Sequence, residues 1–121
     1  MPPSITVSRD ERTSPADPAG EDFDGYVKRQ SQVLATTLPG FQRRPDSPLG
    51  SGSGEARDIL FSWRSNAISL TQWVVWIALA DGTVLTFTAT SESSRFEQHR
   101  ATFEASLRSL VIDPTAFSSL D

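Results

Sequence analysis

The stretch from Ile68 to Thr90 constrains the fold of this chain more than any other. Two apolar runs, rich in β-branched and aromatic residues, flank the dipeptide Asp81-Gly82. Such runs on both sides of an Asp-Gly step are the strongest short-range signal for a β-hairpin. We therefore predict two antiparallel strands joined by a tight turn at the centre of the fold.

The first arm of this hairpin is apolar on both faces, whereas many antiparallel strands leave one face to water. Successive residues of a strand point to opposite faces, so the arm divides into two sets. One set holds Trp73, Val75, Ile77 and Leu79, and the other holds Ile68, Leu70, Gln72, Val74 and Trp76. Such a strand must be covered on both faces, unless one face is kept for a partner.

Composition narrows the class of protein and of partner. The 121 residues have the size of one ordinary domain, and we expect a single domain over residues 1–121. A formal net charge of −4 disfavours nucleic acid, because no excess of Lys and Arg is present to neutralise phosphates. The first residues lack the pattern of a secretory signal, and no apolar run approaches the ~18–20 residues of a membrane span. We expect a soluble, cytoplasmic protein without direct membrane insertion.

The rest of the chain predicts two helices and several shorter strands. Asp22 to Leu38 has apolar residues at helical spacing, and Pro39-Gly40 ends that helix. A second helix is predicted from Arg95 to Leu107 or Leu110. Shorter strands are predicted at Ser4 to Ser8, Phe41 to Arg44, Arg57 to Arg64 and Val111-Ile112, and residues 114–121 are expected to form a loose tail.

This order of elements predicts an α+β fold, with an antiparallel β-sheet and two helices packed on one face. Strand alternation then divides the sheet into a helix-covered face and an open face. The covered face would hold Ile59, Phe61 and Trp63 with Trp73, Val75, Ile77 and Leu79. Leu60, Val74 and Trp76 would lie on the open face.

Two hairpin registers fit the turn at Asp81-Gly82, and they send the second arm to opposite faces. A strict two-residue turn pairs Trp76 with Phe87. One additional loop residue pairs Trp76 with Thr88 and Ile77 with Phe87. We favour the second register because it separates apolar from polar side chains. It puts Leu85 and Phe87 in the helix-side core, and Thr86, Thr88 and Thr90 on the other face.

The sequence gives little support to catalysis. His99 is the single histidine and lies in a predicted amphipathic helix, and there is no cysteine. No serine stands in a Gly-x-Ser-x-Gly nucleophile elbow, and Ser51 to Gly54 lacks the Gly-Lys ending of a phosphate loop. The acidic residues show no metal-ligand spacing. We therefore expect a protein that is not an enzyme and has no cofactor and no metal site.

The second apolar face of the central strand has three explanations. It packs on another layer of this chain, forms a dimer interface, or makes a groove for an apolar partner. Gln72 stands within this face, and an amide that both donates and accepts can hold a polar or backbone atom of such a partner. The alternative for Gln72 is a position at the exposed end of the strand.

The order and spacing of these motifs resemble the DcrB-like family, and within it the Eag-type (effector-associated) chaperones of bacterial type VI secretion. The matching segments span most of the chain, from Ile5 to Leu110. The most telling pieces are LPGF from Leu38, WR at Trp63, the lone Gln72 and TAT from Thr88.

The resemblance implies a PsbP-like sandwich fold and a homodimer. Eag-type members hold the N-terminal transmembrane helices of type VI effectors, using apolar strand residues and glutamines on a concave sheet face. Gln72 resembles the family's strand glutamine, and Ile5 and Val7 resemble apolar residues of its first strand. The expected partner-binding residues are Ile5, Val7, Leu60, Leu70, Gln72, Val74 and Trp76, of which Leu60, Val74 and Trp76 extend the face by strand parity.

The chain departs from the family in two ways. Family members carry a further N-terminal segment before the strand at Ile5, so we expect a truncated start or a fold completed by a partner copy. Trp73 and Val74 stand where relatives often have polar residues, which would make the partner face more apolar. The competing hypothesis is a general DcrB-like or PsbP-like binding module with another protein partner.

Overall fold

The computed structural model describes residues 3–11, 23–45, 49, 56–79 and 83–112. The described strands form one five-stranded antiparallel sheet in the order β1-β5-β4-β3-β2. This sheet and its two helices confirm the α+β class. The elements are β1 (Ser4–Glu11), α1 (Phe23–Thr37), β2 (Gln42–Arg43), β3 (Ala56–Ser65), β4 (Ile68–Ala78), β5 (Thr83–Glu92), the 3-10 turn η1 (Ser93–Arg95) and α2 (Phe96–Ile112).

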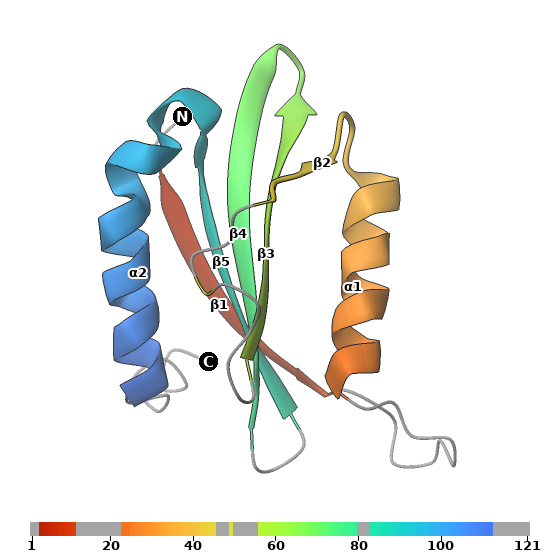
Figure 1. The fold of residues 1–121 in the computed structure, drawn as a ribbon, viewed down its shortest axis with the longest axis vertical. Helices are drawn as coiled ribbons and strands as arrows, with labels where there is room; N and C mark the ends of the chain where they lie inside the picture. The colour runs from red at the N-terminus through yellow and green to blue at the C-terminus, as the bar shows by residue number, and fades with distance from the viewer. Residues whose placement is uncertain (1–2, 12–22, 46–48, 50–55, 80–82, 113–121) are drawn as a thin grey trace.

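The two helices lie on opposite faces of the sheet, so the expectation that they share one face is wrong (Figure 1). α2 packs through Phe96, Phe103 and Leu107 on one face, which we call the α2 side. α1 packs through Tyr26 on the other face, which we call the α1 side. The described residues therefore form three layers, with the sheet between the two helices.

The turn between β3 and β4 decides which residues of these two strands share a face. Ser65 pairs with Ile68, so a two-residue turn joins the strands. Asn66, the first residue of that turn, has a φ of 57°, a left-handed conformation that asparagine tolerates better than most residues. A two-residue turn makes odd-numbered residues of β3 pair with even-numbered residues of β4.

That register reverses the expected faces of β3. Ile59 pairs with Val74, and Leu60 pairs with Trp73. Directly opposite residues of an antiparallel pair share a face. Ile59, Phe61 and Trp63 consequently lie on the α1 side, and Leu60 lies in the α2-side core.

The hairpin formed by β4 and β5 has neither of the two registers considered from the sequence. Trp76 pairs with Thr86, two residues from the favoured partner Thr88. A shift of two residues keeps every side chain on its face. The favoured division is therefore confirmed, with Leu85 and Phe87 on the α2 side and the threonines of β5 on the α1 side. The connection at residues 80–82 lies outside the described residues.

The α2-side core is the larger and more fully buried of the two. The rings of Trp73 and Phe87 meet edge to face at 5.6 Å, and those of Phe96 and Phe103 are 5.4 Å apart. Ile5 and Val7 of β1 pack at its margin. Its buried members are Leu60, Trp73, Val75, Leu85, Phe87, Ala89, Phe96, Phe103 and Leu107.

The α1-side core is smaller, and α1 contributes one fully buried residue to it, Tyr26. Half-buried residues of α1, including Val27 and Leu34, complete the contact. The buried members are Tyr26, Ile59, Phe61, Val74, Trp76 and Val84.

Two element boundaries differ from the sequence prediction. β1 continues to Glu11 because it pairs with β5 along its whole length, from Ser4 with Thr90 to Glu11 with Thr83. Val111-Ile112 do not form a strand but end α2, since a helix already in progress overrides their β propensity. The short strand β2 lies within its predicted range, and residues 114–121 lie outside the described residues. Among the described helices, none is long and apolar enough to cross a membrane.

Candidate partner-binding surface

A row of hydrogen-bonded side chains crosses β3, β4 and β5 on the α1 side. Trp63 Nε1 donates to Gln72 Oε1 at 2.6 Å, and Gln72 Nε2 donates to Thr90 Oγ1 at 3.0 Å. An indole nitrogen can only donate, so the amide oxygen of Gln72 must face Trp63 and the amide nitrogen must face Thr90. The Thr90 hydroxyl accepts from Gln72 and ends the row.

Hydroxyl side chains continue this row from β5 to the edge strand β1. Thr90, Thr88 and Thr86 of β5 pair with Ser4, Thr6 and Ser8 of β1, respectively, and all share the α1 side. The β1 residues are exposed, and Thr86 and Thr88 are half-buried. We call these residues the hydroxyl strip: Ser4, Thr6, Ser8, Thr86, Thr88 and Thr90.

The hydroxyl strip lies beside the area that α1 covers. Among the described residues, the buried sheet residues of the α1-side core come from β3, β4 and Val84 of β5, and none belongs to the strip. Figure 1 shows α1 next to β3, whereas β1 forms the other edge of the sheet. Apart from Thr90, which is 8% exposed, the strip is therefore an accessible polar surface next to an apolar core.

The structure divides the predicted binding residues between the two faces. Leu70, Gln72, Val74 and Trp76 share the α1 side, as their alternation in β4 requires. Leu60 lies on the α2 side, so the parity argument that joined it to Val74 and Trp76 is wrong. Ile5 and Val7 also face the α2 side, where they are half-buried against the core.

Most of these side chains are already packed within the chain. Leu60, Leu70, Val74 and Trp76 are each at most 5% exposed. For Val74 and Trp76 the covering layer is α1, the first of the three explanations considered above. Gln72 is half-buried in the middle of β4, opposite Phe61 and Thr90, and not at an exposed strand end.

Sequence reasoning missed the partner of Gln72 on β3 and left Ser4, Thr6 and Ser8 out of the candidate site. The signal for the first was Asn66, because a two-residue turn there puts Trp63 diagonally across from Gln72. The signal for the second was the alternation of Ser4, Thr6 and Ser8 with the apolar residues between them.

Comparison with known proteins agrees with this architecture. The solved structure of PA94 from Pseudomonas aeruginosa, a protein of unknown function, is similar, with a TM-score of 0.61 and 20% identity. The match covers 88% of this chain and 81% of that chain, and at this identity it shows a shared fold. No curated protein matches the chain. The DcrB family model matches residues 2–109, nearly the whole length, and the chain therefore belongs to the DcrB family.

Proposed function

We propose that this DcrB-family chain is a non-catalytic chaperone that shields an apolar, transmembrane-type helix of a type VI secretion effector and aids its loading. The observation that carries the proposal is the hydroxyl strip, with Gln72 fixed at its end by Trp63. The secretion system and the effector are proposed from the resemblance of the motifs from Ile5 to Leu110 to Eag-type chaperones.

A transmembrane-type helix in water exposes far more apolar surface than a soluble protein tolerates. Serine and threonine are small enough to let a helix backbone approach closely, as they do between helices inside membranes. They also offer hydrogen-bond donors to that backbone. The strip would supply both properties over the length of β1 and β5.

The direction of the hydrogen bonds favours a particular feature of the bound helix. From Trp63 to Gln72 to Thr90, each donor points towards β5. The Thr90 hydroxyl, which is 8% exposed, would offer its own proton to an acceptor of the bound helix. A helix with a proline or glycine kink has backbone carbonyls that need new donors. We propose that such a kink would lie against Thr90.

We propose that the chain acts in the cytoplasm as a homodimer and needs no cofactor for this role. One sheet face covers only one side of a helix. A second copy would present an identical strip to the other side. The partner would then be enclosed between two chains, while each chain keeps its own cores.

The test is co-expression with the N-terminal region of the effector encoded beside this chain, followed by size-exclusion chromatography of the soluble fraction. Thr6→Asp with Thr88→Asp puts two charges on the strip at one cross-strand pair. We expect this double variant to lose the soluble complex. Thr102→Asp with Ser109→Asp, two exposed positions of α2, should retain it.

Circular dichroism and thermal melting must show that both double variants are folded. A folded strip variant that still holds the effector region would overturn the proposed surface. An unaltered chain that leaves the effector region insoluble would overturn the chaperone role itself.

A further inference from the structure

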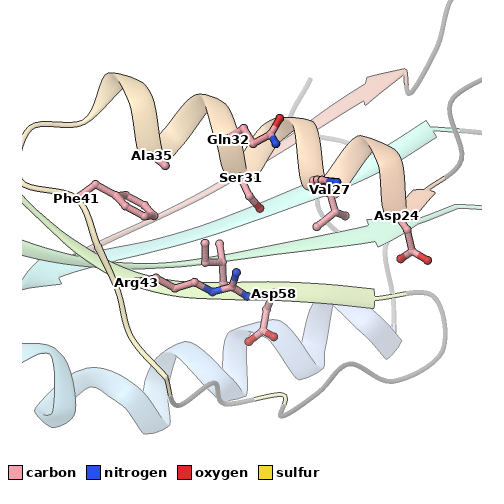
Figure 2. Close-up of a pocket in the computed structure, with 10 residues that line it drawn as sticks. Asp24, Val27, Ser31, Gln32, Ala35, Phe41, Arg43 and Asp58 are labelled. Carbon is pink, nitrogen blue, oxygen red and sulfur yellow. The ribbon is translucent and has the colours of Figure 1, made fainter.

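A groove of about 470 Å³ lies between α1 and the sheet edge formed by β2 and β3. This edge is opposite the one that carries β1 and the exposed part of the hydroxyl strip. Figure 2 shows Val27 and Ser31 extending from α1 towards β3, with Phe41 near one end and Asp24 near the other. The volume of the groove is within the range of ordinary ligand sites, roughly 300–1,000 Å³.

The groove has the length of a short extended peptide. Its α1 wall runs from Asp24 to Ala35, which at 1.5 Å per residue is roughly 16 Å. An extended chain rises about 3.3 Å per residue, so about five residues would fit along it. Ser31 and Ala35 are small, so this wall leaves room for the side chains of an occupant.

The floor of the groove is apolar and firmly supported. Ile59 is buried, and Val27 and Phe41 are half-buried parts of the α1-side core. The ring of Phe41 lies 5.0 Å from that of Phe61, a fully buried residue. Apolar side chains of an occupant would therefore meet a preformed surface.

The charges of the groove favour an acidic occupant. Asp24 pairs with Arg57 at 3.2 Å, whereas the Asp58 carboxylate points away from α1 and accepts a hydrogen bond from Trp73 Nε1 on the α2 side at 2.6 Å (Figure 2). Lys28 and Arg43 are exposed, and within the part of the chain that the structure describes no ion pair joins either to an acid. Two cations are thus available at the groove of a chain whose net charge is −4.

We propose that this groove binds an extended, acidic segment of a partner protein. Side chains of an extended segment alternate between two directions. Apolar residues would point to the floor at Val27, Phe41 and Ile59, and the acidic residues between them would meet Lys28 and Arg43 at the rim. The groove is separate from Gln72 and the hydroxyl strip. The proposed peptide binding therefore does not depend on the proposed chaperone function, and each can be tested without the other.

The probe is a blocked peptide, Leu-Asp-Leu-Asp-Leu, titrated into isotopically labelled full-length chain and followed by amide chemical shifts. We expect saturable shifts confined to α1, β2 and β3, and weaker binding as salt is raised. The matched peptide Leu-Lys-Leu-Lys-Leu should not bind. Equal binding of the two peptides, no saturable binding, or shifts centred on the hydroxyl strip would each overturn the proposal.

Charge reversal tests the role of the two cations. Lys28→Glu with Arg43→Glu should weaken binding of the acidic peptide by roughly tenfold, because two attractions become repulsions. Arg95→Glu with Arg108→Glu makes the same change of net charge at exposed positions of η1 and α2, and it should leave affinity unchanged. An equal loss in both pairs would mean attraction by net charge alone and would overturn the site.

Filling the groove tests its shape without changing charge. Ala35→Trp should abolish binding of the acidic peptide because the indole would occupy the space beside α1. Ala105→Trp, at an exposed position of α2, is the matched control and should bind normally. Both sites are exposed in the folded chain, so each variant is expected to fold. Retained binding by folded Ala35→Trp would contradict the assignment of the groove.

Discussion

Each face of the sheet has one tryptophan that donates its indole proton across strands, and the two bonds differ in their surroundings. On the α2 side, Trp73 is 1% exposed and donates to the carboxylate of Asp58 at 2.6 Å. On the α1 side, Trp63 is half-buried and donates at the same distance to the amide of Gln72. The first bond satisfies a buried core, whereas the second starts a row of donors that reaches an accessible surface.

The helices repeat this contrast. α2 buries Phe96, Phe103 and Leu107 in a continuous apolar core. α1 buries Tyr26 and otherwise makes half-buried contacts. The groove lies between α1 and the edge formed by β2 and β3, and the hydroxyl strip lies towards the opposite edge at β1. The sheet therefore separates a side with a continuous buried core from a side with a smaller core and more accessible surface.

The largest expected effect tests the tighter packing of α2. Phe103→Ala removes a fully buried ring and should lower the free energy of unfolding by about 3–5 kcal/mol, measured by urea denaturation. Leu34→Ala on α1 removes a half-buried side chain and should cost only about 1–2 kcal/mol. Equal losses of stability in the two variants would show that α1 is packed as tightly as α2, contrary to the contrast described above.

The next effect compares one acid on each side. Asp58→Ala leaves the buried indole nitrogen of Trp73 without this acceptor and should cost about 1.5–3 kcal/mol. Asp24→Ala removes an ion pair with Arg57 in which the aspartate side chain is 70% exposed, so its cost should be within about 0–1 kcal/mol. Urea denaturation of the two variants side by side checks the order, and a larger loss for Asp24→Ala would contradict it.

A smaller effect is expected for the hydrogen-bonded row on the α1 side. Gln72→Met preserves the shape of the side chain but removes both hydrogen bonds, and it should cost about 0.5–1.5 kcal/mol. Water can reach the half-buried site and partly replace the lost partners. Gln32→Met at an exposed position of α1 is the control and should leave stability unchanged. If Gln72→Met lost as much stability as Asp58→Ala, the α1 side would be as closed to water at this position as the α2 side.

The fold class and the location of most elements could be predicted because they depend on local patterns. The alternation in β3 and β4 and the helical spacing in α1 and α2 are visible within a few residues of one another. The predicted register of the β4–β5 hairpin is wrong, but the predicted faces are correct, because a shift of two residues leaves each side chain on its face.

The relation between faces could not be obtained in the same way. It depends on whether the link from β3 to β4 has an even or odd number of residues, and one residue reverses the whole strand. The sequence therefore predicts the wrong side for Leu60, and it predicts both helices on one face although each covers its own face of the sheet. The groove beside α1 could not be predicted from the sequence for the same reason, because its lining requires Val27 and Ile59 on the same side of the sheet.

The smallest prediction tests the turn that sets these faces. Asn66 has a φ of 57°, where a Cβ is strained and where glycine is not. Asn66→Ala should therefore destabilise the chain by about 0.5–1 kcal/mol, and Asn66→Gly should be neutral or slightly stabilising. Ala67→Gly, at the adjacent position, should instead lose about 0.4–1 kcal/mol by making the unfolded chain more flexible.

Opposite effects of glycine at neighbouring positions can be measured by thermal melting and urea denaturation of the three variants. They would tie the left-handed residue to Asn66 and so confirm that a two-residue turn holds Trp63 on the same face as Gln72. If glycine were equally destabilising at both positions, the turn would differ from the one described. Trp63 and Trp73 would then not lie on opposite sides of the sheet. The contrast between the α1 side and the α2 side would be wrong.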